Sequence, residues 1–180
     1  MDLVDLIEEK RFIGQEFLTW LWWKSEERGG VIALAAEGDI VVVFEKHMLL
    51  EYGEGESSEK LTCRGLQTEL QEARTGLVMG KKLEQARIQL THNDYEWNFT
   101  LAGSLMEFRN VKLPKTEGDT GPTNNPEERE GMVLERIFLF EQLERMVLEL
   151  FRLFLQVRVG EGWREELLKV REWVNKAERV

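Results

Sequence analysis

The sequence predicts an α+β protein in which helices pack on an antiparallel sheet and a long helix closes the chain. Three observations support this prediction. Apolar and polar residues alternate through residues 82–113, apolar residues recur at helical spacing on both sides of that region, and one apolar stripe runs from residue 133 to residue 157. With 180 residues, 42% of them hydrophobic, the chain is large enough for a core of ordinary size.

The first predicted element is a helix over residues 2–27. Its apolar residues recur at spacings near three and four, at Leu3, Ile7, Phe17, Leu18 and Leu21. We expect Gly14 to interrupt this helix, because glycine weakens a helix interior by roughly 1 kcal/mol. We expect the glycine pair at residues 29–30 to end it.

Short strands are predicted through the middle of the chain. They cover residues 31–35, 40–44 with a continuation to 52, 60–64, 82–90, 96–101 and 105–113, and a helix over residues 68–78 lies between the third and the fourth. Turns are expected at residues 37–39 and 92–94. The alternation slips at residues 84–85, which predicts a β-bulge there.

A proline-containing segment marks the clearest boundary. Residues 114–126 hold all three prolines and no bulky apolar residue, so this stretch is predicted to be a loop. The predicted organisation is an α+β domain over residues 1–114, a linker loop over residues 115–126, and a helical segment over residues 127–180 that packs on the same core.

Two helices are expected after this boundary. Asn125 is the predicted N-cap and Pro126 the first residue of a helix that continues to about residue 159. A last amphipathic helix is expected over residues 163–177.

Charge and composition exclude several function classes. The chain carries 34 acidic and 24 basic side chains, so its formal charge of −10 repels polyanions and any DNA contact needs a local basic patch. One cysteine, Cys63, excludes an intrachain disulfide and suits a reducing compartment. No apolar run is long enough to span a bilayer, and residues 1–5 are acidic where a signal peptide would be basic. We therefore expect a cytoplasmic protein without membrane contact.

No strong catalytic or cofactor motif is found in the sequence. Cys63, His47 and His92 lack the spacing of a zinc site or a nucleophile pair. A metal-dependent nuclease would need carboxylates from separate elements, which the sequence neither shows nor excludes. We expect no enzyme activity, no cofactor and no metal. The tryptophans of residues 20–23 could stack on bases, but we interpret them as core residues, with Trp22 partly exposed.

Several segments occur in the order and spacing of one known family. Residues 12–22, FIGQEFLTWLW, resemble the LGxEFLTWLW stretch of RdgC-like recombination-associated proteins. The other matching segments are residues 68–80, 86–90, 97–101, 108–114 and 136–143, which resemble that family's helix, paired strands and closing helix. The resemblance covers most of residues 12–160 and corresponds to the C-terminal half of a full-length member.

The resemblance implies a non-catalytic, sequence-nonspecific DNA-binding protein that modulates homologous recombination. Its partner would be duplex DNA, and it would associate with the nucleoid. The implied DNA-contact residues are Arg64, Arg74, Lys81, Lys82 and Arg87. A second basic group near the end of the predicted meander comprises Arg109, Lys112 and Lys115.

The alternative is a protein-interaction or oligomerisation module without DNA activity. The predicted helix after residue 126 is apolar over more than half of its circumference, so it must be covered on several sides. We expect a second copy or a partner chain to supply part of that cover. The candidate interface residues are Ile137, Phe140, Val147, Phe151 and Phe154.

Overall fold

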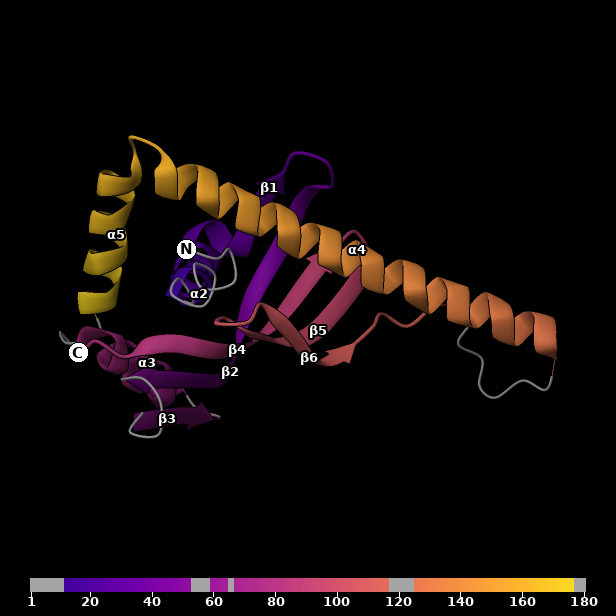
Figure 1. The fold of residues 1–180 in the computed structure, drawn as a ribbon, viewed down its shortest axis with the longest axis horizontal. Coiled ribbons are helices and arrows are strands. Elements are labelled where there is room, and N and C mark those ends of the chain that lie inside the picture. The colour runs from indigo at the N-terminus through magenta and orange to yellow at the C-terminus, as the bar shows by residue number, and fades with distance from the viewer. Residues whose placement is uncertain (1–11, 53–58, 65–66, 117–124, 177–180) are drawn as a thin grey trace, which may run out of the picture.

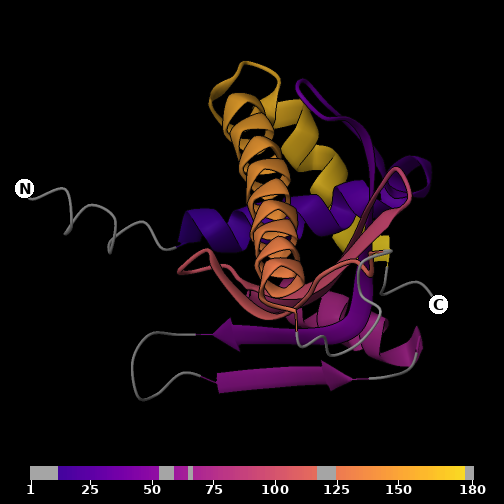
Figure 2. The same cartoon turned by 90° about the vertical axis from the view of Figure 1, so that its right-hand side faces the viewer.

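In the computed structural model, which describes residues 12–52, 59–64, 67–116 and 125–176, one antiparallel sheet carries helices on one of its faces (Figures 1 and 2). The elements in chain order are α2 (Phe12–Glu26), the short 3₁₀ helix η1 (Glu27–Gly30), β1 (Val31–Leu34), β2 (Gly38–Tyr52), β3 (Glu59–Arg64), α3 (Gln67–Val78), β4 (Lys82–His92), β5 (Tyr95–Ala102), β6 (Glu107–Lys112), α4 (Pro126–Val159) and α5 (Trp163–Asn175). The predicted α+β class, with its antiparallel sheet and long helix near the end of the chain, is confirmed.

The sheet is built around the long strand β2. Its strand order is β1-β2-β4-β5-β6, and β3 pairs with the second half of β2. Leu49 of β2 lies opposite Gln85 of β4, whereas the next residue, Leu50, lies opposite Leu83. Glu84 is therefore the extra residue of a bulge, at the position where the sequence alternation slips.

The bulge turns the carboxylate of Glu84 toward α2 and the β5–β6 turn. Glu84 is only 7% exposed. Its carboxylate accepts hydrogen bonds from Nε2 of Gln15, at 2.6 Å, and from Oγ of Ser104. A buried carboxylate needs such donors, because desolvation without hydrogen bonds costs several kcal/mol. These bonds fix the start of α2 against the sheet.

One face of the sheet forms the core and the other is polar. The buried residues of β2 lie at alternate positions along the strand. Among them, Phe44 stacks on Trp22 of α2, and Leu50 lies beside Gly76 of α3. Trp97 of β5 is fully buried, and its indole Nε1 donates to the carbonyl of Leu139 in α4 at 3.0 Å. Helices α2, α3 and α4 thus share one face, and no helix among the described residues covers the other.

The predicted partial exposure of Trp22 is wrong. Trp22 is 1% exposed and lies between Phe44, at 6.3 Å, and Trp173 of α5, at 4.9 Å between ring centroids. The reason is tertiary: Trp173 of α5, from a distant part of the chain, packs edge-on against Trp22. The interpretation of residues 20–23 as core is confirmed.

Gly14 does not break α2, because the described helix begins at Phe12 and passes through it. The glycine instead permits a close backbone approach: a Cβ at this position would lie 1.9 Å from the carbonyl oxygen of Gly103. The segment of the predicted helix before Phe12 lies outside the described residues.

Gly14→Ala is therefore expected to destabilise the fold by about 1–3 kcal/mol, although alanine has the higher helix propensity. Gly131 in α4 is the matched control, because a Cβ there meets nothing within 4 Å. Gly131→Ala should raise stability by up to about 1 kcal/mol. Urea unfolding measures both. Equal stabilisation by the two substitutions would show that the Gly14–Gly103 contact carries no constraint.

Helix α4 begins where the sequence predicts and extends beyond the sheet (Figure 1). The side-chain oxygen of Asn125 accepts from the backbone N–H of Glu127 at 3.1 Å, and Pro126 occupies the first helical position. The first buried residue of α4 is Leu139. Among the described residues, no helix combines the length and the apolar character that crossing a bilayer requires.

Candidate functional site

A cluster of exposed apolar side chains lies on the projecting end of α4 (Figure 1). Residues 126–138, here called the α4 arm, contain no buried residue and correspond to about 20 Å of helix. Four large apolar side chains of the arm are at least half exposed: Val133 (56%), Leu134 (59%), Ile137 (50%) and Phe138 (55%). Single exposed apolar residues are common, whereas a cluster of this kind marks an interaction site.

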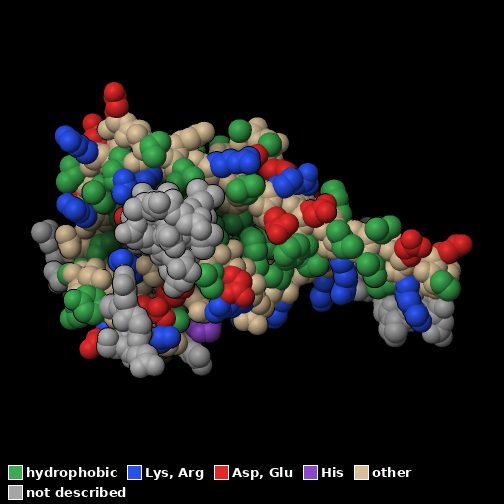
Figure 3. Space-filling model, in the orientation of Figure 1, with side chains coloured by type: hydrophobic (Ala, Val, Ile, Leu, Met, Phe, Trp, Pro, Cys, Tyr) green, Lys and Arg blue, Asp and Glu red, His purple; other side chains and the backbone are tan. Residues whose placement is uncertain are grey.

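An apolar groove lies beside the middle of the same helix. This groove, here called the β6 groove, has a volume of about 630 Å³. It is lined by Met106, Phe108, Glu141, Glu144, Arg145, Val147, Leu148 and Phe151. Leu148 is 46% exposed within it. Figure 3 shows hydrophobic side chains both on the arm and beside the middle of α4, with acidic side chains between them.

The arm and the β6 groove share one side of α4. Ile137, Glu144, Leu148 and Phe151 follow one another at spacings of seven, four and three, which places them along a single helix face. The core-facing residues Leu139, Leu143, Met146, Leu150 and Phe154 form a different stripe. The helix therefore has one apolar stripe buried in its own chain and a second that is open.

The structure divides the five predicted interface residues between these two stripes. Ile137 lies on the open stripe, and Phe140 and Phe151 are half-buried against Phe108 and Phe17. Val147 and Phe154 are 4% and 0% exposed, so their assignment to an interface is corrected: they are core residues. The reason is that α2 and the sheet already cover that side of α4.

The predicted interface left out four open residues, Val133, Leu134, Phe138 and Leu148. The signal for them was the width of the apolar stripe, since a helix packed on one side needs only part of its circumference to be apolar. The sequence does not show which edge of that wide stripe the rest of the chain covers.

The predicted DNA-contact residues do not form one strip. Arg74 packs inside a structural cluster: its guanidinium lies 4.6 Å from the ring centroid of Trp173 and pairs with the carboxylate of Glu26. Arg87 lies on the polar face of the sheet, and its Nε is 2.6 Å from Oε2 of Glu45. The side chain of Arg64 lies outside the described residues.

Lys81 and Lys82, by contrast, lie together at the turn between α3 and β4. Lys81 is ion-paired, with its Nζ 3.1 Å from Oε2 of Glu59. Both lysines line a groove of about 510 Å³ under helix α5, here called the α5 groove. Arg171 of α5 lies in the same lining. This is where the structure brings two of the predicted DNA-contact residues together.

The second basic group is also partly neutralised. Arg109 donates from Nε to Glu107 at 3.0 Å and from Nη2 to the same carboxylate oxygen at 2.5 Å. The side-chain hydrogen bond with Glu107, together with the Coulomb attraction of that carboxylate, raises the pKa of Arg109 above its ordinary value. Arg109 stays charged, but it presents its charge together with a carboxylate.

Cys63 and His92 have ordinary structural surroundings. Cys63 is buried, at 2% exposure, and Nε2 of His92 lies 2.9 Å from the carbonyl oxygen of Glu37. Within the described ranges no three His, Cys, Asp or Glu side chains come together as a metal site.

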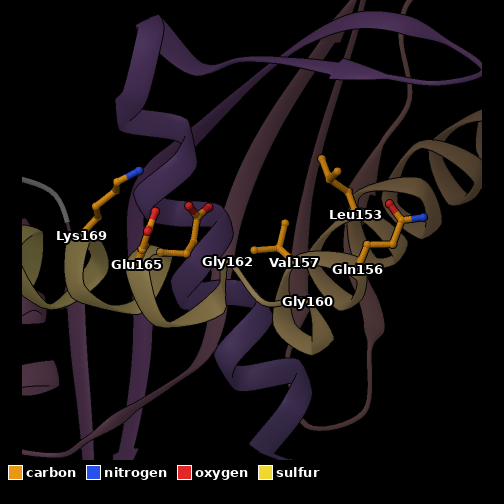
Figure 4. A pocket seen from close by; sticks show the side chains of 8 residues that line it. Leu153, Gln156, Val157, Gly160, Gly162, Glu165 and Lys169 are labelled. Carbon is orange, nitrogen blue, oxygen red and sulfur yellow. The ribbon is translucent and has the colours of Figure 1, made fainter.

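A shallower concavity of about 420 Å³ lies at the elbow where α4 turns into α5 (Figure 4). Leu153, Gln156 and Val157 line it from α4, and Glu165 and Lys169 line it from α5. In Figure 4 Glu165 and Lys169 extend to the same side of their helix, so this concavity has acidic and basic groups side by side. The third charged residue of the lining, Glu166, is ion-paired with Nζ of Lys24 at 3.0 Å.

Comparison of the chain with protein-family models, curated proteins and solved structures gives no match. The likeness to RdgC-like proteins therefore remains a prediction from the sequence.

Proposed function

We propose that this protein is a self-association module in which two copies pair through the open stripe of α4. The observation that supports the proposal best is the exposure of Val133, Leu134, Ile137 and Phe138, four large apolar side chains on a helix end that no other described element covers. Burying such surface is the main driving force of protein association.

A second copy is the partner that the geometry fits. The chain has a protruding apolar element, the α4 arm, and an apolar recess, the β6 groove, on the same side of the same helix. If the α4 helices of two copies lie antiparallel, the α4 arm of each copy packs into the β6 groove of the other. Both contacts are then equivalent, which is the self-complementary arrangement that a twofold dimer requires.

Charge favours the antiparallel arrangement over the parallel one. Residues 127–136 contain four glutamates and two arginines, whereas residues 139–159 contain three of each. Parallel pairing would place two acidic arms against each other, and like charges repel. Antiparallel pairing keeps the two acidic arms apart and also opposes the two helix dipoles favourably.

The test of the proposal is the solution mass. The mass measured by multi-angle light scattering over a concentration series should approach twice the 21.1 kDa of one chain. A constant mass of one chain at the highest concentrations would contradict the proposal. A mass that grows without limit would contradict the twofold arrangement, because open-ended contacts do not close.

We propose sequence-nonspecific DNA binding as a second candidate function. The observation that favours it is the meeting of Lys81, Lys82 and Arg171 in the lining of one groove, from segments far apart in the sequence. The ion pairs of Arg74 and Arg87 with glutamates weigh against it, because a DNA surface needs cations that phosphates can neutralise.

Under this second proposal, duplex affinity should fall linearly on a double-logarithmic plot against salt. Replacing both Lys81 and Lys82 by glutamine should reduce the slope by about 0.9 for each lost phosphate contact. Fluorescence anisotropy with labelled duplex measures it. The matched control is Lys46→Gln with Lys169→Gln, two exposed lysines that do not line the α5 groove. Equal slopes for the two double variants would remove the α5 groove from any DNA contact, and no binding at low salt would remove the function.

A further inference from the structure

Helix α5 is fixed to the body of the protein near its two ends. At its start, the Trp163 ring makes an edge contact with Phe154 at 6.1 Å, and the guanidinium of Arg158 lies 4.9 Å from the Trp163 centroid. Near its end, Trp173 is buried against Trp22, and its Nε1 donates to Glu26 at 2.8 Å. Trp173 is the one buried residue of this helix.

The space between these two attachments is the α5 groove. Its apolar wall is formed by Trp20, Leu77, Val78, Trp163, Leu167, Val170 and Val174. Leu167, Val170 and Val174 are half-buried, so the middle of α5 faces this space without filling it. The volume of about 510 Å³ falls in the range of about 300–1,000 Å³ that is typical of small-molecule sites.

The charges of the lining are opposite in sign to the charge of the chain. Lys81, Lys82 and Arg171 line the groove, against one carboxylate, Glu16. Glu16 is already occupied, because Nε of Arg158 donates to its Oε2 at 3.0 Å. A local cationic lining in a protein of formal charge −10 selects for an anion.

The ion pair between Lys81 and Glu59 does not close the site. The Lys81 side chain is 15% exposed, whereas that of Glu59 is 76% exposed, so the lysine lies mostly inside and its partner in solvent. A pair with one member in solvent contributes little to stability. A ligand anion held at the mouth can therefore replace or share Glu59 at small cost.

We propose that the α5 groove is a binding site for a small amphipathic anion, with an apolar chain or ring against Leu77, Val170 and Val174 and a carboxylate at Lys81, Lys82 and Arg171. The site is independent of the α4 stripe. Neither self-association nor DNA binding is needed for it, so its success or failure is decided separately from both.

Decanoate is the probe for this site, and isothermal titration calorimetry is the measurement. We expect one site per chain and an affinity that increases about threefold to fourfold for each CH₂ from hexanoate to octanoate to decanoate. Decanol and decyltrimethylammonium carry the same chain without the negative charge and should bind at least tenfold more weakly. Equal binding of all three ligands would overturn the proposal, and so would inorganic phosphate that binds as tightly as decanoate.

Two variants separate this groove from other apolar surfaces. Lys81→Gln combined with Lys82→Gln should weaken decanoate binding at least tenfold while leaving decanol unchanged. Val174→Trp, which fills the groove, should weaken both ligands. Leu134→Glu on the α4 arm is the matched control and should leave decanoate affinity unchanged. Loss of binding in this control, or unchanged binding in both groove variants, would place the ligand outside the groove and refute the site. Thermal melts establish that every variant is folded.

Discussion

Leu134→Glu is expected to convert the proposed dimer into a monomer. The substitution places a carboxylate in the middle of an apolar contact, where its desolvation has no compensating partner. Truncating one hot-spot residue costs about 2 kcal/mol or more, and a twofold interface contains the change twice, so the dissociation constant should rise on the order of a thousandfold. The fold should remain intact, because Leu134 is 59% exposed in the single chain.

Leu168→Glu provides the matched control for this experiment. Leu168 is 58% exposed and also lies on a helix, α5, but away from the open stripe of α4. It should leave the dimer mass and the dissociation constant unchanged. Analytical ultracentrifugation measures both variants. If Leu168→Glu dissociates the protein as strongly as Leu134→Glu, the interface is not on α4; if neither variant changes the mass, the α4 stripe does not mediate association.

Much of the fold could be predicted from the sequence, because its signals are local. Asn125 followed by Pro126 defines the start of α4 through one side-chain hydrogen bond and one fixed dihedral angle. The slip in alternation at residues 84–85 predicts the bulge that β2 and β4 form. Each signal depends on neighbours in the chain, which the sequence displays directly.

The features that could not be predicted depend on distant partners. The sequence predicts that Gly14 interrupts the helix, but in the structure Gly14 permits the close approach of the Gly103 backbone. Trp22 reads as partly exposed, but α5 returns from the far end of the chain to cover it. For the same reason, Arg74 reads as a surface cation and is instead held between α2 and α5 by Glu26 and Trp173.

The candidate interface shows where periodicity ceases to be informative. A stripe wider than one packing face predicts that part of α4 contacts something beyond its own sheet. The sequence places Phe154 and Ile137 together as candidate interface residues, because both belong to the apolar stripe of residues 133–157. Only the positions of α2 and β6 decide that Phe154 is internal and Ile137 open. This division makes opposite predictions for two residues that the sequence treats alike.

Phe154→Ala is expected to destabilise the chain by about 3–5 kcal/mol, the second large effect. Phe154 is fully buried, and its ring lies 5.6–5.7 Å from Trp20 and Phe17 and 6.1–6.2 Å from Trp163 and Phe151. Alanine would remove the ring on which α2, α4 and the start of α5 converge. A cavity among aromatic side chains collapses poorly, because their planar rings have few alternative rotamers.

Ile137→Ala on the open stripe should change the unfolding free energy of one chain by no more than about 0.5 kcal/mol. Both alanine variants should be made in the Leu134→Glu background, so that association does not contribute to the measured stability. Urea unfolding followed by tryptophan fluorescence and circular dichroism gives the two values. If Phe154→Ala and Ile137→Ala lower the unfolding free energy by the same amount, α4 does not have separate buried and open stripes. A large loss for Phe154 alone means that the wide apolar circumference of α4 serves two surfaces, one that holds the chain together and one that remains for a partner.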